Sequence, residues 1–204
     1  MGVFGYYREG ARLTIINSGM ATTPFTDIKT EAGTQDRSYR WYMSAINRLA
    51  GNIQNQSSVF RSDIGELKGS LEIGHMYMFL YDPKTKDTLP YWDKFPLCIP
   101  YENTKGGWYG LNLHYIPPML RMQLLGKLLD YTNEGKMDAA WGLLKNTSRF
   151  KGVKPCVKRY LVSHVKSRFL KVDPEHWKAA ILLPLADFKG ATNQEVWSDS
   201  RNSL

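Results

Sequence analysis

The sequence predicts an α+β fold, in which helices flank a small antiparallel, barrel-like sheet and an extended N-terminal arm precedes the body. Short runs of strand-forming residues joined by tight turns fill residues 76–115. Apolar residues at helical spacing follow in residues 117–169. The first 35 residues are rich in Gly, Ser and Thr and show no clear period. With 204 residues, 43% of them hydrophobic, the chain is long enough to bury a substantial core.

We expect three parts along the chain. Residues 1–35 form the extended arm. Residues 36–70 hold one helix, which ends at Gly51, and then a polar, irregular connection from residue 52 onwards. Residues 71–204 form the α+β body.

The strands of the body are predicted from residue type and alternation. Residues 76–81 are rich in strand formers, and residues 82–87 form a turn with Pro at its second position. Residues 97–101 form a short strand, which their prolines assign to a sheet edge. After a turn at Lys105, residues 108–115 alternate in the manner of a half-buried strand.

Helical patterns dominate the next stretch. Pro117 and Pro118 open a helix whose apolar stripe is leucine, because Pro is favoured in the first turn. A second helix is expected at residues 137–144, and a third after Pro155 with apolar residues at 3–4 spacing up to Phe169.

The C-terminal part carries three further signals. Residues 173–175, Asp-Pro-Glu, form a one-turn helix start. Residues 179–185 are a continuous apolar run, which indicates a buried strand. Residues 192–195, Thr-Asn-Gln-Glu, have the form of a capping box and open a last short helix.

No metal, cofactor or membrane signal is found. Cys98 and Cys156 have apolar neighbours and are expected to be buried free thiols. The four His residues show no ligand spacing, so neither a metal nor a cofactor is expected. No apolar run is long enough to span a bilayer, and the first residues show no secretory signal.

Positive charge is concentrated in one segment. The chain has a net charge of +8, and residues 145–171 contain nine cations and no Asp or Glu. Such a segment can bind DNA phosphates through counterion release, with interleaved aromatic residues to stack on bases. DNA contact is the leading interpretation, and the alternatives are contact with an acidic protein and a solvated helix face. The candidate nucleic-acid-binding residues are Lys145, Arg149, Lys151, Lys154, Lys158, Arg159, Lys166, Arg168 and Lys171.

No catalytic residue is predicted. A nuclease would need two or three carboxylates around one metal ion, and Asp82, Asp87, Asp93 and Glu102 are candidates. Each of them lies in a turn or near Pro, however, where ordinary turn chemistry accounts for it. His114 is expected to be a structural residue rather than a base. The chain is therefore interpreted as not being an enzyme.

Two segments are candidates for contact with a partner. The arm has apolar residues that can add a strand to another chain's sheet or fold back on its own body. The segment at residues 89–97 combines aromatics and prolines, so it either covers the sheet or docks in a partner's groove. The candidate partner-binding residues are Leu13, Ile15, Ile16, Phe25, Tyr91, Trp92 and Phe95.

Four stretches carry a resemblance to known proteins. Residues 76–97 (MYMFLYDPKTKDTLPYWDKFPL) and 107–118 (GWYGLNLHYIPP) resemble a family of short virion-associated proteins of T-even-type contractile-tailed bacteriophages. Residues 154–161 (KPCVKRYL) and 176–185 (HWKAAILLPL) are also similar. The likeness covers roughly residues 70–200. Some members are DNA end protectors, and others are structural proteins of the neck, tail or baseplate.

This resemblance implies a non-enzymatic component of a tailed-phage particle near the DNA exit path. Such a protein is made in the host cytoplasm and located in the virion. Its partners would be other neck, tail or baseplate proteins and double-stranded DNA, whose end it would bind through the basic segment. One alternative is a structural connector without DNA contact, and another is a metal-dependent DNA end-processing nuclease. The family brings no catalytic motif.

Overall fold

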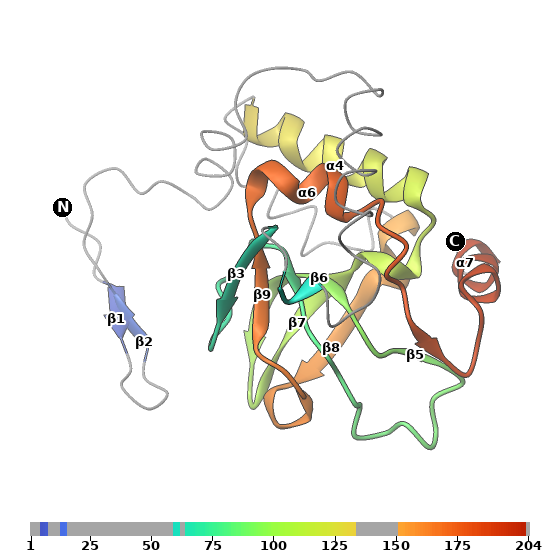
Figure 1. Ribbon diagram of the computed structural model, residues 1–204, viewed down its shortest axis with the longest axis horizontal. Coiled ribbons are helices and arrows are strands. Elements are labelled where there is room, and N and C mark those ends of the chain that lie inside the picture. The colour runs from blue at the N-terminus through green and yellow to red at the C-terminus, as the bar shows by residue number, and fades with distance from the viewer. Residues whose placement is uncertain (1–4, 8–12, 16–58, 62–63, 134–150, 203–204) are drawn as a thin grey trace.

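A computed structural model describes residues 5–7, 13–15, 59–61, 64–133 and 151–202 (Figure 1). These residues combine short helices with antiparallel strands, which confirms the α+β class. The largest element is a six-stranded sheet in the order β3-β9-β4-β6-β7-β8, with every pair antiparallel. Its strands are β3 (Gly65–Lys68), β4 (Tyr77–Met78), β6 (Leu97–Thr104), β7 (Gly107–Asn112), β8 (Val157–Leu161) and β9 (Phe169–Val172).

The sheet is curled but open. An isolated bridge joins Tyr81, beyond the end of β4, to Val165 in the connection between β8 and β9. In the part of the chain that the structure describes, β3 and β8 remain the two edges, so the barrel-like detail is not confirmed. β3 lies within residues that were expected to be an irregular connection, and that expectation is wrong for Gly65–Lys68. The division into three parts stays a prediction.

β6 is a central strand and not the predicted edge strand. It pairs with β4 on one side and with β7 on the other. The register shifts between Pro100 and Glu102, so a bulge accommodates the missing N–H of Pro100 inside the sheet. The predicted turn before β7 is confirmed, and Gly106 adopts a φ of +75° there, which favours glycine.

The helix predicted after Pro155 is wrong. The chain forms a 3₁₀ turn, η3 (Lys151–Cys156), and then enters strand β8 before a second 3₁₀ turn, η4 (Val162–His164). Pairing with β7 decides this outcome, because β8 adds to its open edge over five residue pairs from Gly107↔Leu161 to Leu111↔Val157. Gly107 makes the close approach possible, since a Cβ atom there would collide with the backbone carbonyl of Tyr160.

α4 (Pro118–Asn133) and α6 (Trp177–Ala180) lie along one side of the sheet, and α7 (Asn193–Asn202) lies to the side, near β5 (Trp92–Asp93) (Figure 1). α4 begins at the second of the two prolines, as predicted, after the 3₁₀ turn η1 (Leu113–Tyr115). α7 begins at the predicted capping box, where the Glu195 carboxylate accepts from the Thr192 N–H at 2.7 Å. The helices expected at residues 36–49 and 137–144 lie outside the described residues.

The buried strand predicted at residues 179–185 is also wrong. A 3₁₀ turn, η5 (Pro174–His176), leads into α6 (Trp177–Ala180), which confirms the predicted one-turn start. The Ile181 N–H donates to the carbonyl of Trp177, so the apolar run continues as turns. An apolar run of this length does not distinguish a buried turn from a strand. β10 (Phe188–Lys189) follows and pairs with β5 (Trp92–Asp93).

The two faces of the sheet bury different side chains. Aliphatic residues such as Leu97, Ile99 and Leu170 pack towards the helices. The opposite face carries a cluster dominated by aromatic rings, in which Phe79 makes edge-to-face contacts with its neighbours. The members of this aromatic cluster are Tyr77, Phe79, Tyr81, Cys98, Trp108, Tyr160 and Phe169. Cys98 and Cys156 are buried free thiols, as predicted.

Candidate nucleic-acid interface

The structure divides the predicted basic segment between two strands of the sheet. Lys145 and Arg149 lie outside the described residues, and only the backbone of Lys151 is described. Lys158 and Arg159 lie on the edge strand β8, with exposed Lys154 just before it. Lys166 lies in the connection, and Arg168 and Lys171 belong to the β9 side. The described cations of the segment therefore do not form one helix face.

The cations on the β9 side are held by the protein itself. The Lys171 ammonium lies 2.7 Å from a Glu72 carboxylate oxygen, and this hydrogen bond is the main cause that lowers the pKa of Glu72. The same carboxylate lies 3.2 Å from the imidazole of His75. Arg168 donates from Nη2 to the carbonyl of Leu67 at 2.8 Å.

The cations on the β8 side have surroundings different from those on the β9 side. Within the described ranges, no carboxylate lies within 4.0 Å of the charged atoms of Lys154, Lys158 or Arg159. The Lys158 ammonium lies 3.7 Å from the centre of the Tyr115 ring, where burial lowers its pKa. Arg159 is exposed and makes one long hydrogen bond, of 3.4 Å, to the carbonyl of Lys105.

A cleft of about 710 Å³ opens beside β8. One wall is the segment from Pro83 to Trp92, and the other is β8 itself. Lys84, Lys158 and Arg159 line it together with partly buried aromatic rings. The structure therefore brings two of the predicted cations next to two of the predicted partner-binding residues, Tyr91 and Trp92, which lie more than 60 positions away in the sequence.

A smaller hollow of about 400 Å³ contains Lys166. It also holds Lys94 and Lys189, together with Asp82 and Asp187. Lys94 lies 3.0 Å from Asp187, so part of this charge is neutralised within the protein. Lys166 remains exposed.

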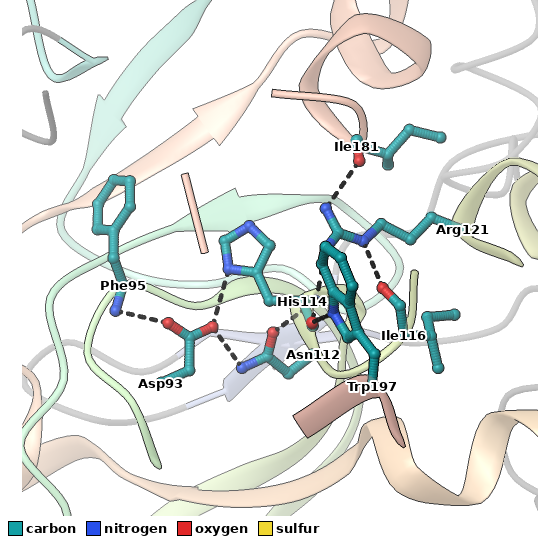
Figure 2. A network of polar contacts seen from close by, with 8 residues as sticks. All are labelled: Asp93, Phe95, Asn112, His114, Ile116, Arg121, Ile181 and Trp197. Carbon is teal, nitrogen blue, oxygen red and sulfur yellow. Dashed lines mark hydrogen bonds and ion pairs between the residues drawn. The ribbon is translucent and has the colours of Figure 1, made fainter. Parts of the chain in front are cut away.

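Asp93 and Asn112, which line the cleft, belong to a buried polar network (Figure 2). The Asp93 carboxylate accepts hydrogen bonds from the Phe95 N–H at 2.9 Å and the Asn112 side-chain amide at 2.9 Å, and it lies 2.8 Å from Nδ1 of His114. Burial lowers the pKa of His114 despite the neighbouring carboxylate, so the neutral ring donates from Nδ1. His114 is thus structural, as predicted, whereas Asp93 is more than a turn residue.

Arg121 is a second buried polar residue, which sequence reasoning missed. It donates from Nε to the carbonyl of Ile116 at 2.8 Å and from Nη1 to that of Ile181 at 2.9 Å (Figure 2). Its guanidinium lies 5.7 Å from the centre of the Trp197 ring. Burial lowers its pKa to about 10, so it stays charged near neutral pH. The sequence feature that could have revealed its burial is its position on the leucine stripe, because Leu125 lies one turn further along α4.

The predicted partner-binding residues have different surroundings. Tyr91 and Trp92 are partly buried at the cleft. Phe95 is fully buried against Phe60, so its predicted contact with a partner disagrees with the structure. A phenylalanine side chain gains more by covering the core than by facing water.

The arm prediction is untested. Leu13 and Ile15 belong to β2 (Leu13–Ile15), which pairs with β1 (Gly5–Tyr7) of the same chain. Ile16 and Phe25 lie outside the described residues. Addition of this segment to another chain's sheet stays a prediction.

The acidic residues do not converge on one point. Among the residues that the structure describes, no group of three or more His, Cys, Asp or Glu side chains could hold a metal ion. Asp82 lies 3.1 Å from the Lys86 ammonium, and Asp93 belongs to the buried network. No described helix is long and apolar enough to cross a bilayer.

The described residues define a basic α+β protein in which Lys84, Lys158 and Arg159 line a cleft together with aromatic rings. A comparison with protein-family models matches residues 6–200 to the Phage T4 terminal DNA protecting protein. The match spans nearly the whole chain, so this protein belongs to that family of phage DNA-protecting proteins. The description names a protective protein and not an enzyme, in agreement with the resemblance of residues 70–200. No curated protein and no solved structure matches.

Proposed function

We propose that this chain binds the ends of double-stranded phage DNA in the virion and shields them without cutting them. Membership of the terminal DNA protecting family carries the proposal. The net charge of +8 supports contact with a polyanion. The unpaired cations of the β8 side, with the adjacent cleft, are the surface that we assign to this contact.

Cations without acidic partners favour this assignment for a physical reason. Each Lys or Arg that neutralises a phosphate releases a condensed counterion, and this release drives binding. Lys154 and Arg159 are free to do so, whereas Lys171 would first have to leave Glu72. The β8 side therefore contributes more phosphate contacts per cation than the β9 side.

Binding of the full chain to two forms of one DNA sequence tests the proposal. One form is a linear duplex with free ends, and the other is a covalently closed circle. We expect tighter binding to the linear form, affinity that falls steeply as salt rises, and protection of the linear form from an exonuclease. Equal affinity for both forms, or unimpeded digestion at saturating protein, would exclude a role at DNA ends.

Two matched double variants test the surface. Lys154→Gln with Arg159→Gln removes two charges from the β8 side, and Arg168→Gln with Lys171→Gln removes two from the β9 side. We expect the first pair to reduce the slope of log affinity against log salt by about 2 and the second pair to reduce it by less. An equal reduction by both pairs would spread the interface over the whole sheet and contradict this assignment.

The absence of cutting is tested with linear DNA and Mg²⁺ or Mn²⁺. We expect the DNA to stay at full length, because the Asp93 carboxylate is occupied by Phe95, Asn112 and His114. Metal-dependent cutting that is lost on changing Asp82, Asp93 or Glu102 would establish a nuclease.

The location of the chain in purified particles tests the virion part of the proposal. We expect a few copies next to the packaged DNA. Many symmetric copies in the tail or baseplate, away from DNA, would favour the structural connector.

A further inference from the structure

The cleft beside β8 has the size and lining of a site for a single nucleotide. Its volume of about 710 Å³ lies within the range of about 300–1,000 Å³ that is typical of ligand pockets. Its walls come from β8 and from the segment between Pro83 and Trp92, so it is bounded on two sides. Among the described residues, no carboxylate forms an ion pair with the cations at its rim.

Aromatic rings in the cleft are held in place by their neighbours. Tyr91 packs against Phe188 at a ring-centre distance of 6.2 Å and against Tyr115 at 6.1 Å. Trp92 is anchored by the pairing of its backbone with Lys189 in β10. Both rings are partly buried and still line the open volume. Such fixed rings are suited to stacking on a base, which is sequence-tolerant because every base has a π-face.

Positive charge lies beside these rings. Lys158 is positioned by its contact with the Tyr115 ring, and Lys84 and Arg159 are exposed at the rim. Among the described residues that line the cleft, Asp93 carries the carboxylate, and its partners are Phe95, Asn112 and His114. The Asp199 carboxylate lies close by, hydrogen-bonded to Tyr91. An incoming phosphate would therefore meet three cations and acids that are already hydrogen-bonded. Loss of water around Lys158 strengthens its attraction to an anion.

A DNA end can place both a base and a phosphate in one small site, whereas a continuous duplex cannot. Inside a duplex every base is stacked and paired, and extracting one costs a few kcal/mol. At an end the last base is stacked on one side only. We infer that the cleft binds the terminal nucleotide of a DNA end, with the base against Tyr91 and Trp92 and the terminal phosphate at Lys158 and Arg159. This inference rests on the proposed function.

The experiment compares end preference among cleft and control variants of the full chain. End preference is the ratio of affinities for the linear duplex and the closed circle, measured with 5′-phosphate, 3′-phosphate and hydroxyl ends. We expect Trp92→Leu to reduce this ratio about tenfold, as expected for the loss of one stacked base. Lys158→Met keeps a long side chain beside Tyr115 but removes the ammonium that lies over its ring, and we expect it to abolish discrimination between phosphate and hydroxyl ends.

Controls separate this inference from the proposed function. Arg168→Gln lies outside the cleft and should lower affinity for the linear and circular forms equally. Lys84→Gln, at an exposed turn position, repeats the phosphate test without touching the core. If the unmodified chain shows no end preference, the proposed function fails. If it prefers ends but Trp92→Leu, Lys158→Met and Lys84→Gln leave the preference unchanged, the function stands and the cleft is not the site.

Discussion

The two ends of the basic segment differ in what surrounds their cations. On the β9 side, Lys171 pairs with Glu72 and Arg168 donates to the carbonyl of Leu67. On the β8 side, Lys158 lies over the Tyr115 ring and Arg159 is exposed at a cleft. Cations of one continuous segment thus contact a carboxylate or a carbonyl at one end, whereas at the other end none of them has a carboxylate partner among the described residues. A count of charges along a sequence overestimates a binding surface when distant acids neutralise part of it.

The largest expected effect on stability comes from displacing β8 from β7. Gly107→Ala places a methyl group against the backbone of Tyr160, so β8 must move away from β7. We expect a loss of about 4 kcal/mol in the free energy of unfolding, measured in denaturant, together with loss of end binding. Gly69→Ala, where a Cβ atom would meet open space, is the matched control and should change stability little. Unchanged stability of Gly107→Ala would mean that β8 is not held closely to β7.

The next largest effect concerns the buried polar network around Asp93. Asp93→Ala leaves three buried donors, from Phe95, Asn112 and His114, without their acceptor. We expect a cost of about 3 kcal/mol in denaturant unfolding, because buried unpaired polar groups carry a desolvation penalty. Asp87→Ala, at an exposed turn position, should cost little. Similar midpoints for both variants would show that the network contributes nothing.

His114 predicts a dependence of stability on pH. Its pKa in the folded protein is lowered below the ordinary value of 6.5, chiefly by burial, so the unfolded chain binds the proton more tightly. The stabilisation is therefore complete above about pH 6.5 and decreases as the pH falls through that value, by at most about 1.4 kcal/mol per pH unit. Thermal unfolding between pH 5 and 7.5 would measure it against His114→Gln. An identical slope in both proteins would assign the effect to other groups.

The smallest expected effect concerns the ion pair between Glu72 and Lys171 on the β9 side. Glu72→Gln removes the acidic partner of Lys171, and a partly exposed ion pair contributes about 1 kcal/mol or less. We expect stability to change little and the salt slope of DNA binding to increase by up to about 1, since Lys171 becomes available to phosphate. Glu175→Gln is the matched control, because it removes the same charge from a carboxylate that lies 3.4 Å from His176. If both variants strengthen binding equally, net charge alone explains the gain.

The elements that could be predicted depend on local signals. α4 begins with prolines and carries a leucine stripe, and the capping box before α7 satisfies its own N–H groups. β8 could not be predicted as a strand, because its apolar residues fit a helical spacing equally well. Its pairing with β7 is a contact between residues about 50 positions apart, and local propensity does not encode it.

The candidate site shows the same division. The cations and the aromatic segment were both found from the sequence, but as separate features. Their meeting at one cleft follows from the placement of Pro83–Trp92 against β8. Asp93 resembled a turn residue because its partners, Asn112 and His114, lie 19 and 21 positions away.

The sequence by itself determined the charge of +8, the segment of nine cations without an acid, the leucine helix and the likeness to phage virion proteins. These properties are local or compositional, so no fold is needed to find them. Only the tertiary structure decided which of the described cations have a carboxylate partner. Lys171 meets Glu72 across 99 positions of sequence, and Lys158 meets the ring of Tyr115. Pairings at such separations depend on how the strands are ordered in the sheet, and the order follows from the burial of both faces together.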